Sequence, residues 1–148
     1  MTLSDELRKI NTIFVDTAPI IYYIEAHPDF GPIAKEVVDA FQSGVLVAYS
    51  SVITLAEVLP QPIRMGREEL ARKFVEFLRK GRNFYLIEIS VNIAERAGRL
   101  RGKYPILKAL DAVQLATALD VKADAFLTND SKLNRIREVK VLVLKDYL

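Results

Sequence analysis

The chain of 148 residues contains no cysteine, no tryptophan and a single histidine, His27. Without cysteine it forms neither disulfides nor thiolate zinc sites, which fits a cytoplasmic protein. With one histidine, a ribonuclease mechanism that needs two histidines of one chain is excluded. A large excess of charge is missing too: the formal net charge is only +2, so charge alone does not predict a polyanionic partner.

Long hydrophobic runs are also absent. The longest uncharged stretch, residues 40–56, is interrupted by Gln42, Gly44 and three serines, and it is shorter than the ~20 apolar residues that a membrane helix needs. The first ten residues, MTLSDELRKI, lack the apolar core of a secretory signal. We therefore expect no membrane segment. The composition predicts one globular domain over residues 1–148, with residues 1–11 as a short N-terminal extension.

Strands and helices are predicted to alternate along the chain. Five apolar runs, most of them rich in β-branched or aromatic residues, predict strands at Thr12–Asp16, Val45–Tyr49, Phe84–Ile89, Ala125–Thr128 and Val141–Leu144. Capping residues and amphipathic spacing predict helices from Thr17, over Pro32–Ser43, from Ser51 to near Pro60, over Arg67–Lys80, from Ser90, over Lys108–Leu119 and over Ser131–Ile136. This order predicts a three-layer α/β/α sandwich with a mainly parallel central sheet.

Four acidic residues lie in apolar surroundings: Asp16, Glu57, Asp111 and Asp130. A buried carboxylate is costly unless it is paired or bound to a cation, and no Lys or Arg lies close beside Asp16 or Glu57 in the sequence. Asp16 ends the first predicted strand and Asp130 follows the fourth, so both belong to the edge where parallel sheets bind ligands. We expect Glu57 and Asp111 to reach the same edge from their helices.

Each acid also has an ordinary structural explanation. Asp16 is a good helix cap, Glu57 lies near a helix end, and Asp130 follows Asn129 in a favourable turn sequence. Asp111 is the hardest to explain in this way, because its helix is apolar on almost every side. All four together are better explained by a common site.

Carboxylates without histidine or cysteine are hard ligands, which favour Mg²⁺ or Mn²⁺. Such a cluster predicts metal-assisted cleavage of phosphodiesters. Thr128 and Asn129 are placed to orient Asp130 or an attacking water. Residues 64–82 carry seven basic and three acidic residues, which fits either a solvated helix face or a surface for a polyanion.

At four blocks the chain resembles the PIN-domain nucleases, and most closely the VapC-type toxins of toxin–antitoxin pairs. These blocks are VDT at 15–17, ITLAEV at 53–58, LDAVQLATAL at 110–119 and LTND at 127–130. The resemblance implies a PIN-like fold and a Mg²⁺- or Mn²⁺-dependent endoribonuclease that hydrolyses RNA. It assigns the catalytic and metal-binding roles to Asp16, Glu57, Asp111 and Asp130.

The same resemblance places Thr17, Thr128 and Asn129 beside the metal ligands. It also implies a cognate antitoxin that blocks the site, and a homodimer. Two positions depart from the family pattern: Leu110 stands where a basic residue is common, and Leu133 where an aromatic residue often follows the last acid. Both departures concern RNA specificity more than catalysis.

Several other functions are weighed against this one. An aspartyl phosphatase needs a second Asp where the chain has Ala18, and neither a P-loop nor a G-x-G-x-x-G motif occurs. A Ser–His–Asp hydrolase would show G-x-S-x-G, which is also absent. Two alternatives stay open: an RNA-processing nuclease outside any toxin pair, and a non-catalytic module that binds RNA or protein.

Overall fold

The computed structural model describes residues 1–148 and contains one five-stranded sheet in the order β3-β2-β1-β4-β5. The strands are β1 (Thr12–Val15), β2 (Val47–Ser51), β3 (Phe84–Ile87), β4 (Ala125–Thr128) and β5 (Lys140–Val143). Every pair of neighbouring strands is parallel. All five predicted strands are present, and β4 has the predicted bounds.

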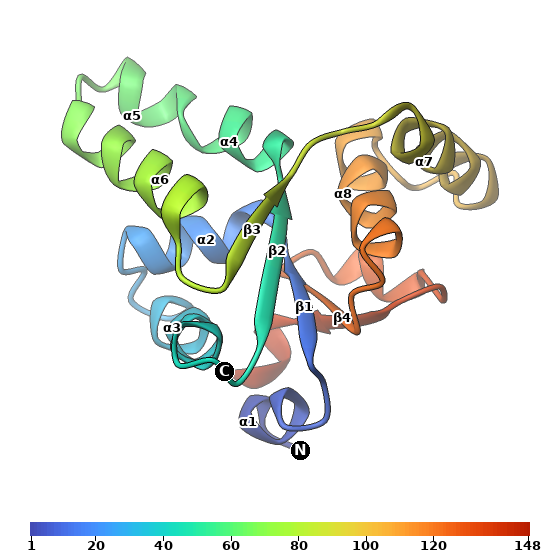
Figure 1. Ribbon diagram of the computed structural model, residues 1–148, viewed down its shortest axis with the longest axis horizontal. Coiled ribbons are helices and arrows are strands. Elements are labelled where there is room, and N and C mark those ends of the chain that lie inside the picture. The colour runs from blue at the N-terminus through green and yellow to red at the C-terminus, as the bar shows by residue number, and fades with distance from the viewer.

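Helices cover both faces of this sheet, which confirms the predicted three-layer sandwich (Figure 1). The α-helices are α1 (Leu3–Leu7), α2 (Thr17–Ile24), α3 (Gly31–Gln42), α4 (Val52–Val58), α5 (Pro60–Arg64), α6 (Glu68–Lys80), α7 (Val91–Lys103) and α8 (Ala109–Asp120). Two short 3₁₀ helices follow, η1 (Ser131–Arg135) and η2 (Leu144–Tyr147). Figure 1 shows α2, α3 and α6 on one side of the sheet, and α7 and α8 on the other. None of these helices combines the length and apolar character needed to cross a bilayer.

Alternation along β1 divides the core into two layers. Ile13 and Val15 belong to the cluster formed with α1 to α4 and α6, whereas Phe14 points to the cluster formed with α7 and α8. Phe14 is in register with Phe126 of β4, and their rings stack at 5.3 Å between centroids. Because successive side chains of a strand face opposite ways, one apolar run supports both layers.

Local capping explains where several helices begin. Ser51 accepts a hydrogen bond from the backbone N–H of Ile53 at the start of α4, and Ser90 caps α7 in the same way. The helix that carries Glu57 ends at Val58, as predicted. Pro60 then begins a further short helix, α5, which the sequence analysis did not include. Proline fits the first turn of a helix as well as it stops the preceding one.

The first eleven residues pack against the rest of the chain. Leu3 and Leu7 of α1 are buried in the same cluster as β1, and Glu6 forms an ion pair with Lys140 of β5. The carboxylate of Asp124 accepts hydrogen bonds from the backbone N–H groups of residues 11 and 12. Residues 1–11 therefore contribute to the core through Leu3 and Leu7.

Candidate functional site

The backbone at the carboxyl end of β1 and β4 positions two of the predicted acids. Asp16 follows β1 and caps α2, so its Oδ1 accepts from the backbone N–H of Thr17 at 2.9 Å. Its Oδ2 accepts from the hydroxyl of Thr128, the last residue of β4, at 2.8 Å. Asp16 therefore does cap a helix, and its carboxylate is at the same time held by the neighbouring strand.

Thr128 also reaches the second acid of this edge. Its Oγ1 accepts from the backbone N–H of Asp130 at 3.1 Å while its proton goes to Asp16. Asp130 then caps η1 by accepting from the backbone N–H of Lys132 at 3.0 Å. One threonine hydroxyl thus joins the backbone of Asp130 to the carboxylate of Asp16.

The other two acids approach from helices. Glu57 is exposed on α4, and its Oε1 accepts from the hydroxyl of Thr17 at 2.7 Å. Asp111 is partly buried in the first turn of α8, whose N-terminus lies at the carboxyl edge of the sheet (Figure 1). Residues from four separate segments therefore approach one edge of the sheet.

The pKa values show that these carboxylates influence one another. Burial raises the pKa of Asp16 to about 6; the hydrogen bonds from Thr17 and Thr128 oppose the rise, and the charges of Asp111 and Glu57 add to it. Burial also raises the pKa of Asp111, and the charges of Asp130 and Glu57 raise it further. Mutual repulsion of this kind favours a cation among the acids.

The positive charges of Lys108 and Lys132 partly oppose the rise in the pKa of Asp111. Lys108 occupies the N-cap position of α8, three residues before Asp111, and its side chain makes no capping hydrogen bond. The backbone N–H of Lys132 donates to Asp130. Both lysine side chains are exposed, and neither forms an ion pair within the chain. Two cationic groups are thus available to an anionic ligand beside the acids.

The four acids do not form a complete metal-binding site in their present positions. No three Asp, Glu or His side chains lie in position to hold a metal ion as they stand. Asp16 is the most constrained of the four, because both of its oxygens are hydrogen-bonded. Glu57 is exposed on α4, and the hydroxyl of Thr17 orients one of its carboxylate oxygens. The donor set is all oxygen, which suits Mg²⁺ or Mn²⁺.

A buried polar network beneath these acids was not predicted. Its members are 0 to 1 % exposed and come from the end of β2, from α4 and from α8: Ser50, Ser51, Thr54 and Gln114. Thr54 Oγ1 lies 2.8 Å from both Ser50 Oγ and Gln114 Nε2. The sequence signal was present, since these polar residues interrupt otherwise apolar segments.

Asn129 is oriented away from the carboxylates. Its Nδ2 donates to the Tyr22 hydroxyl at 3.3 Å, and its Oδ1 accepts from the backbone N–H of Lys145 at 3.0 Å. These bonds tie the loop after β4 to α2 and η2. Asn129 makes no hydrogen bond to any of the four acids, although its neighbours Thr128 and Asp130 both belong to the site.

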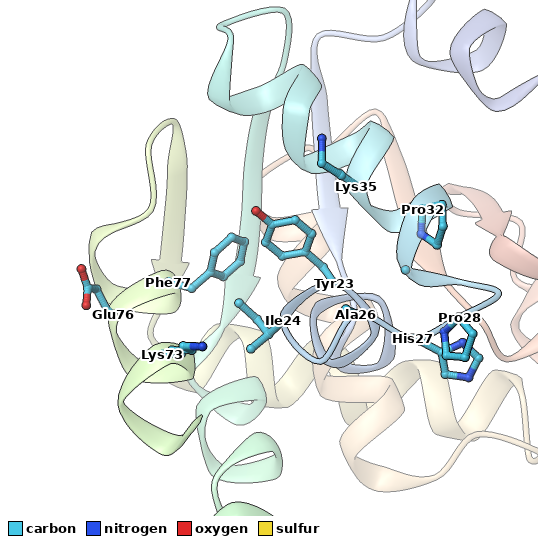
Figure 2. Close-up of a pocket in the computed structure, with 11 residues that line it drawn as sticks. Tyr23, Ile24, Ala26, His27, Pro28, Pro32, Lys35, Lys73, Glu76 and Phe77 are labelled. Carbon is cyan, nitrogen blue, oxygen red and sulfur yellow. The ribbon is translucent and has the colours of Figure 1, made fainter. Parts of the chain in front are cut away.

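The largest cavity lies apart from the acids, between α2, α3 and α6, and measures about 740 Å³. Figure 2 shows Tyr23, Ile24 and Phe77 gathered on one side of it, with Lys73 and Glu76 on the α6 side. The rings of Tyr23 and Phe77 are 5.5 Å apart between centroids. None of the four acids lines this groove, so it is a separate surface feature.

Comparison with solved structures finds several similar folds. A toxin–antitoxin complex from Klebsiella pneumoniae is 27 % identical with a TM-score of 0.66, over 89 % of this chain and 97 % of that chain. DNA-bound VapBC from Salmonella typhimurium has a TM-score of 0.73 at 16 % identity, over 91 % of this chain and 99 % of that chain. VapC20 from Mycobacterium tuberculosis, described as a sarcin-ricin loop cleaving toxin, has a TM-score of 0.68 at 18 % identity, over 86 % and 98 %.

No curated protein sequence matches the chain. The family model described as PIN domain, however, matches residues 13–139. This range includes β2, β3 and β4 completely and β1 without its first residue, and it ends just before β5. All four acids lie inside the matched range. The chain therefore belongs to the PIN domain family.

Proposed function

We propose that the protein is a Mg²⁺- or Mn²⁺-dependent endoribonuclease in which Asp16, Glu57, Asp111 and Asp130 hold the metal. The observation that carries this proposal is the convergence of these carboxylates, from four segments, on the carboxyl edge of a PIN-domain sheet. The raised pKa values of Asp16 and Asp111 support it, because like charges gathered together bind a divalent cation well.

The residues fit such an ion by the chemistry of their donors, which are carboxylate oxygens only. When bound, a divalent ion supplies positive charge that offsets the negative charge developing on a phosphodiester during hydrolysis. The chain supplies the rest. Thr17 N–H and Thr128 hold Asp16, and the Thr17 hydroxyl holds Glu57. Fixed partners of this kind reduce the reorganisation needed when substrate binds.

A nucleic-acid substrate, which we propose to be RNA, is supported by the cationic groups beside the acids. Lys108 and Lys132 are exposed and form no ion pair, and they lie close enough to Asp111 to oppose part of the rise in its pKa. Lysines so placed contact the phosphates of a strand whose scissile bond lies over the acids. Contacts between lysines and phosphates do not depend on the base sequence, so these residues do not indicate which RNA sequence is cut.

We further propose that the protein is the toxin of a type II toxin–antitoxin pair, active in the cytoplasm as a homodimer. The fold likeness to toxins of solved toxin–antitoxin complexes supports the pairing. The groove between α2, α3 and α6 suits a segment of a protein partner, since its floor is apolar and its α6 side carries Lys73 and Glu76 (Figure 2). An antitoxin helix with an apolar face would fit this groove.

Induced expression in bacteria tests the proposal in a cell. Wild type should arrest growth and produce new RNA 5′ ends at defined positions, whereas Asp111→Asn, which removes one metal ligand, should do neither at the same protein level. Growth arrest by both proteins, with no new RNA ends, would contradict the nuclease and favour a binding module. New RNA ends without growth arrest would favour an RNA-processing nuclease instead of a toxin.

A further inference from the structure

Gln114 is a buried amide on the helix that carries Asp111. It lies one turn after Asp111 in α8 and is 1 % exposed, among apolar neighbours such as Leu115 and Ala118. A primary amide buried in this way costs free energy unless its donors and its acceptor are all used. Its partners come from three other places in the fold, so it does not merely serve its own helix.

Those partners are the end of β2, α4 and α2. Gln114 Oε1 accepts from the hydroxyl of Ser51, while Nε2 donates to Thr54 Oγ1 at 2.8 Å and lies 3.5 Å from Thr17 Oγ1. The contacts with Ser51 and Thr54 span 63 and 60 residues of sequence. A single side chain of α8, the helix that carries Asp111, thus touches α2, which follows Asp16, and α4, which carries Glu57.

The direction of each bond follows from the acceptors at the ends of the network. Ser50 gives its proton to the carbonyl of Val15 at 2.9 Å, so in the Ser50–Thr54 pair the donor is Thr54. Thr54 must then accept from the amide of Gln114.

The same reasoning applies to Thr17 and Ser51. Thr17 gives its proton to the carboxylate of Glu57 and is left to accept from Gln114. Ser51 accepts from the backbone N–H of Ile53 and donates to Gln114. Each hydroxyl and amide proton of the network therefore has a single acceptor. The Gln114 amide is the group that donates to both Thr54 and Thr17.

We propose that Gln114 is a positioning residue for the metal site: it sets the relative positions of α2, α4 and α8 and so the spacing of their carboxylates. The inference rests on the proposed function. Without the amide, the Thr17 hydroxyl is free to turn from Glu57 toward Thr54, only 3.2 Å away. Glu57 then loses its partner, and α8 loses its only polar side-chain link to α4.

A matched pair of variants on α8 tests this role. Gln114→Leu keeps the approximate volume and removes the amide, whereas Thr117→Val removes a hydroxyl of equal burial that bonds only to the carbonyl of Val113. The measurement is the dissociation constant of Mn²⁺ for each purified protein, by calorimetric titration without RNA. We expect Gln114→Leu to weaken Mn²⁺ binding by roughly 10-fold or more, the scale seen for residues that orient metal ligands. Thr117→Val should bind Mn²⁺ within about twofold of wild type.

Folding is checked by thermal melting of each variant. If Gln114→Leu fails to fold, Thr54→Val and Thr54→Ser provide the same comparison, because only serine keeps the hydroxyl that receives the amide. Thr54→Val should weaken Mn²⁺ binding and Thr54→Ser should restore it.

Equal Mn²⁺ affinity for wild type and Gln114→Leu would overturn the inference and leave the proposed function intact. An equal loss of Mn²⁺ affinity in Gln114→Leu and Thr117→Val would also overturn it, because the effect would then not be specific to the amide of Gln114. A wild type that binds no Mn²⁺ would overturn both proposals. A wild type that binds Mn²⁺ and cuts no RNA, with weakened binding in Gln114→Leu, would support the positioning role and contradict the nuclease.

Discussion

The hydroxyl of Thr17 donates a hydrogen bond of 2.7 Å to Oε1 of Glu57, across 40 residues of sequence. Thr17 is also the residue whose backbone N–H is bonded to Asp16. One residue therefore holds two of the four acids, by its backbone and by its side chain. Its hydroxyl is the part of that arrangement that a substitution can remove without disturbing the backbone.

Thr17→Val should weaken both metal binding and RNA cleavage. Valine has nearly the same shape but offers no donor to Glu57, so the carboxylate is no longer oriented; a loss of 10- to 100-fold in metal affinity is the expected scale. Thr17→Ser keeps the hydroxyl and serves as the control. Titration with Mn²⁺ measures the effect, and equal affinity for the valine and serine variants would contradict it.

In the metal-free protein, the ionised carboxylate of Asp16 should lower the free energy of unfolding at neutral pH. At acid pH, where Asp16 is protonated, this destabilisation should disappear. Its pKa in the folded protein is about 6, above the ordinary 3.8, so the folded state binds the proton more tightly than the unfolded state. The contribution of Asp16 to stability therefore falls as the pH rises from about 4 to 6 and stays low above that.

Asp16→Asn in EDTA measures this contribution. The variant should exceed the wild type by roughly 2–3 kcal/mol in free energy of unfolding at about pH 7.5, and the difference should vanish near pH 4. Urea denaturation at several pH values gives the numbers. A variant that is less stable than wild type at neutral pH would show that the ionised carboxylate is stabilised, not destabilised, by its surroundings.

Lys132 and Lys108 should contribute to RNA binding more than to the chemical step. Each Lys→Ala change removes one phosphate contact, so the slope of log Kd against log salt should fall by about 1 for each lysine removed. Lys9→Ala is the control, because Lys9 follows α1 at the opposite end of the sheet (Figure 1). Binding is measured with the Asp111→Asn protein to prevent cleavage. An effect of Lys9→Ala as large as that of Lys132→Ala would contradict a local phosphate contact.

Leu7→Ala should destabilise the whole protein, although α1 lies before the residues that match the PIN family model. Leu7 is buried in the main core, and replacing such a leucine by alanine costs about 2–5 kcal/mol. Arg8→Ala, at an exposed neighbour, should change the free energy of unfolding by less than about 0.5 kcal/mol. A Leu7→Ala protein as stable as wild type in urea would mean that α1 is dispensable.

The fold was largely predictable because its signals are local. The run Ala125–Thr128 is apolar and ends at a turn, and the structure has β4 with these bounds. Ser90 predicts the start of α7, because serine is a favourable N-cap residue, and its side chain does cap this helix. The helix α5 was not predicted, because a proline after α4 is compatible both with a loop and with the first turn of a new helix. In the structure α5 packs against α6, and this contact is not visible in the local sequence.

The site was predictable in part for the same reason. Asp16 and Asp130 follow strands, and the parallel order of those strands brings both residues to one edge. The partners of Asn129 and Gln114 were not predictable, because they lie far away in sequence and depend on how α2, α8 and η2 pack. A local pattern shows that a polar residue is buried, but not which group satisfies it.

Cleavage of end-labelled single-stranded RNA by the purified protein, in Mg²⁺, Mn²⁺ and EDTA and beside Asp111→Asn, tests the nuclease most directly. We predict discrete fragments with either ion, no cleavage in EDTA, and no cleavage by the variant under any condition. Cleavage that persists in EDTA or in Asp111→Asn would contradict the metal-dependent mechanism and point to a contaminating nuclease. Intact RNA in every reaction would contradict ribonuclease activity on such a substrate.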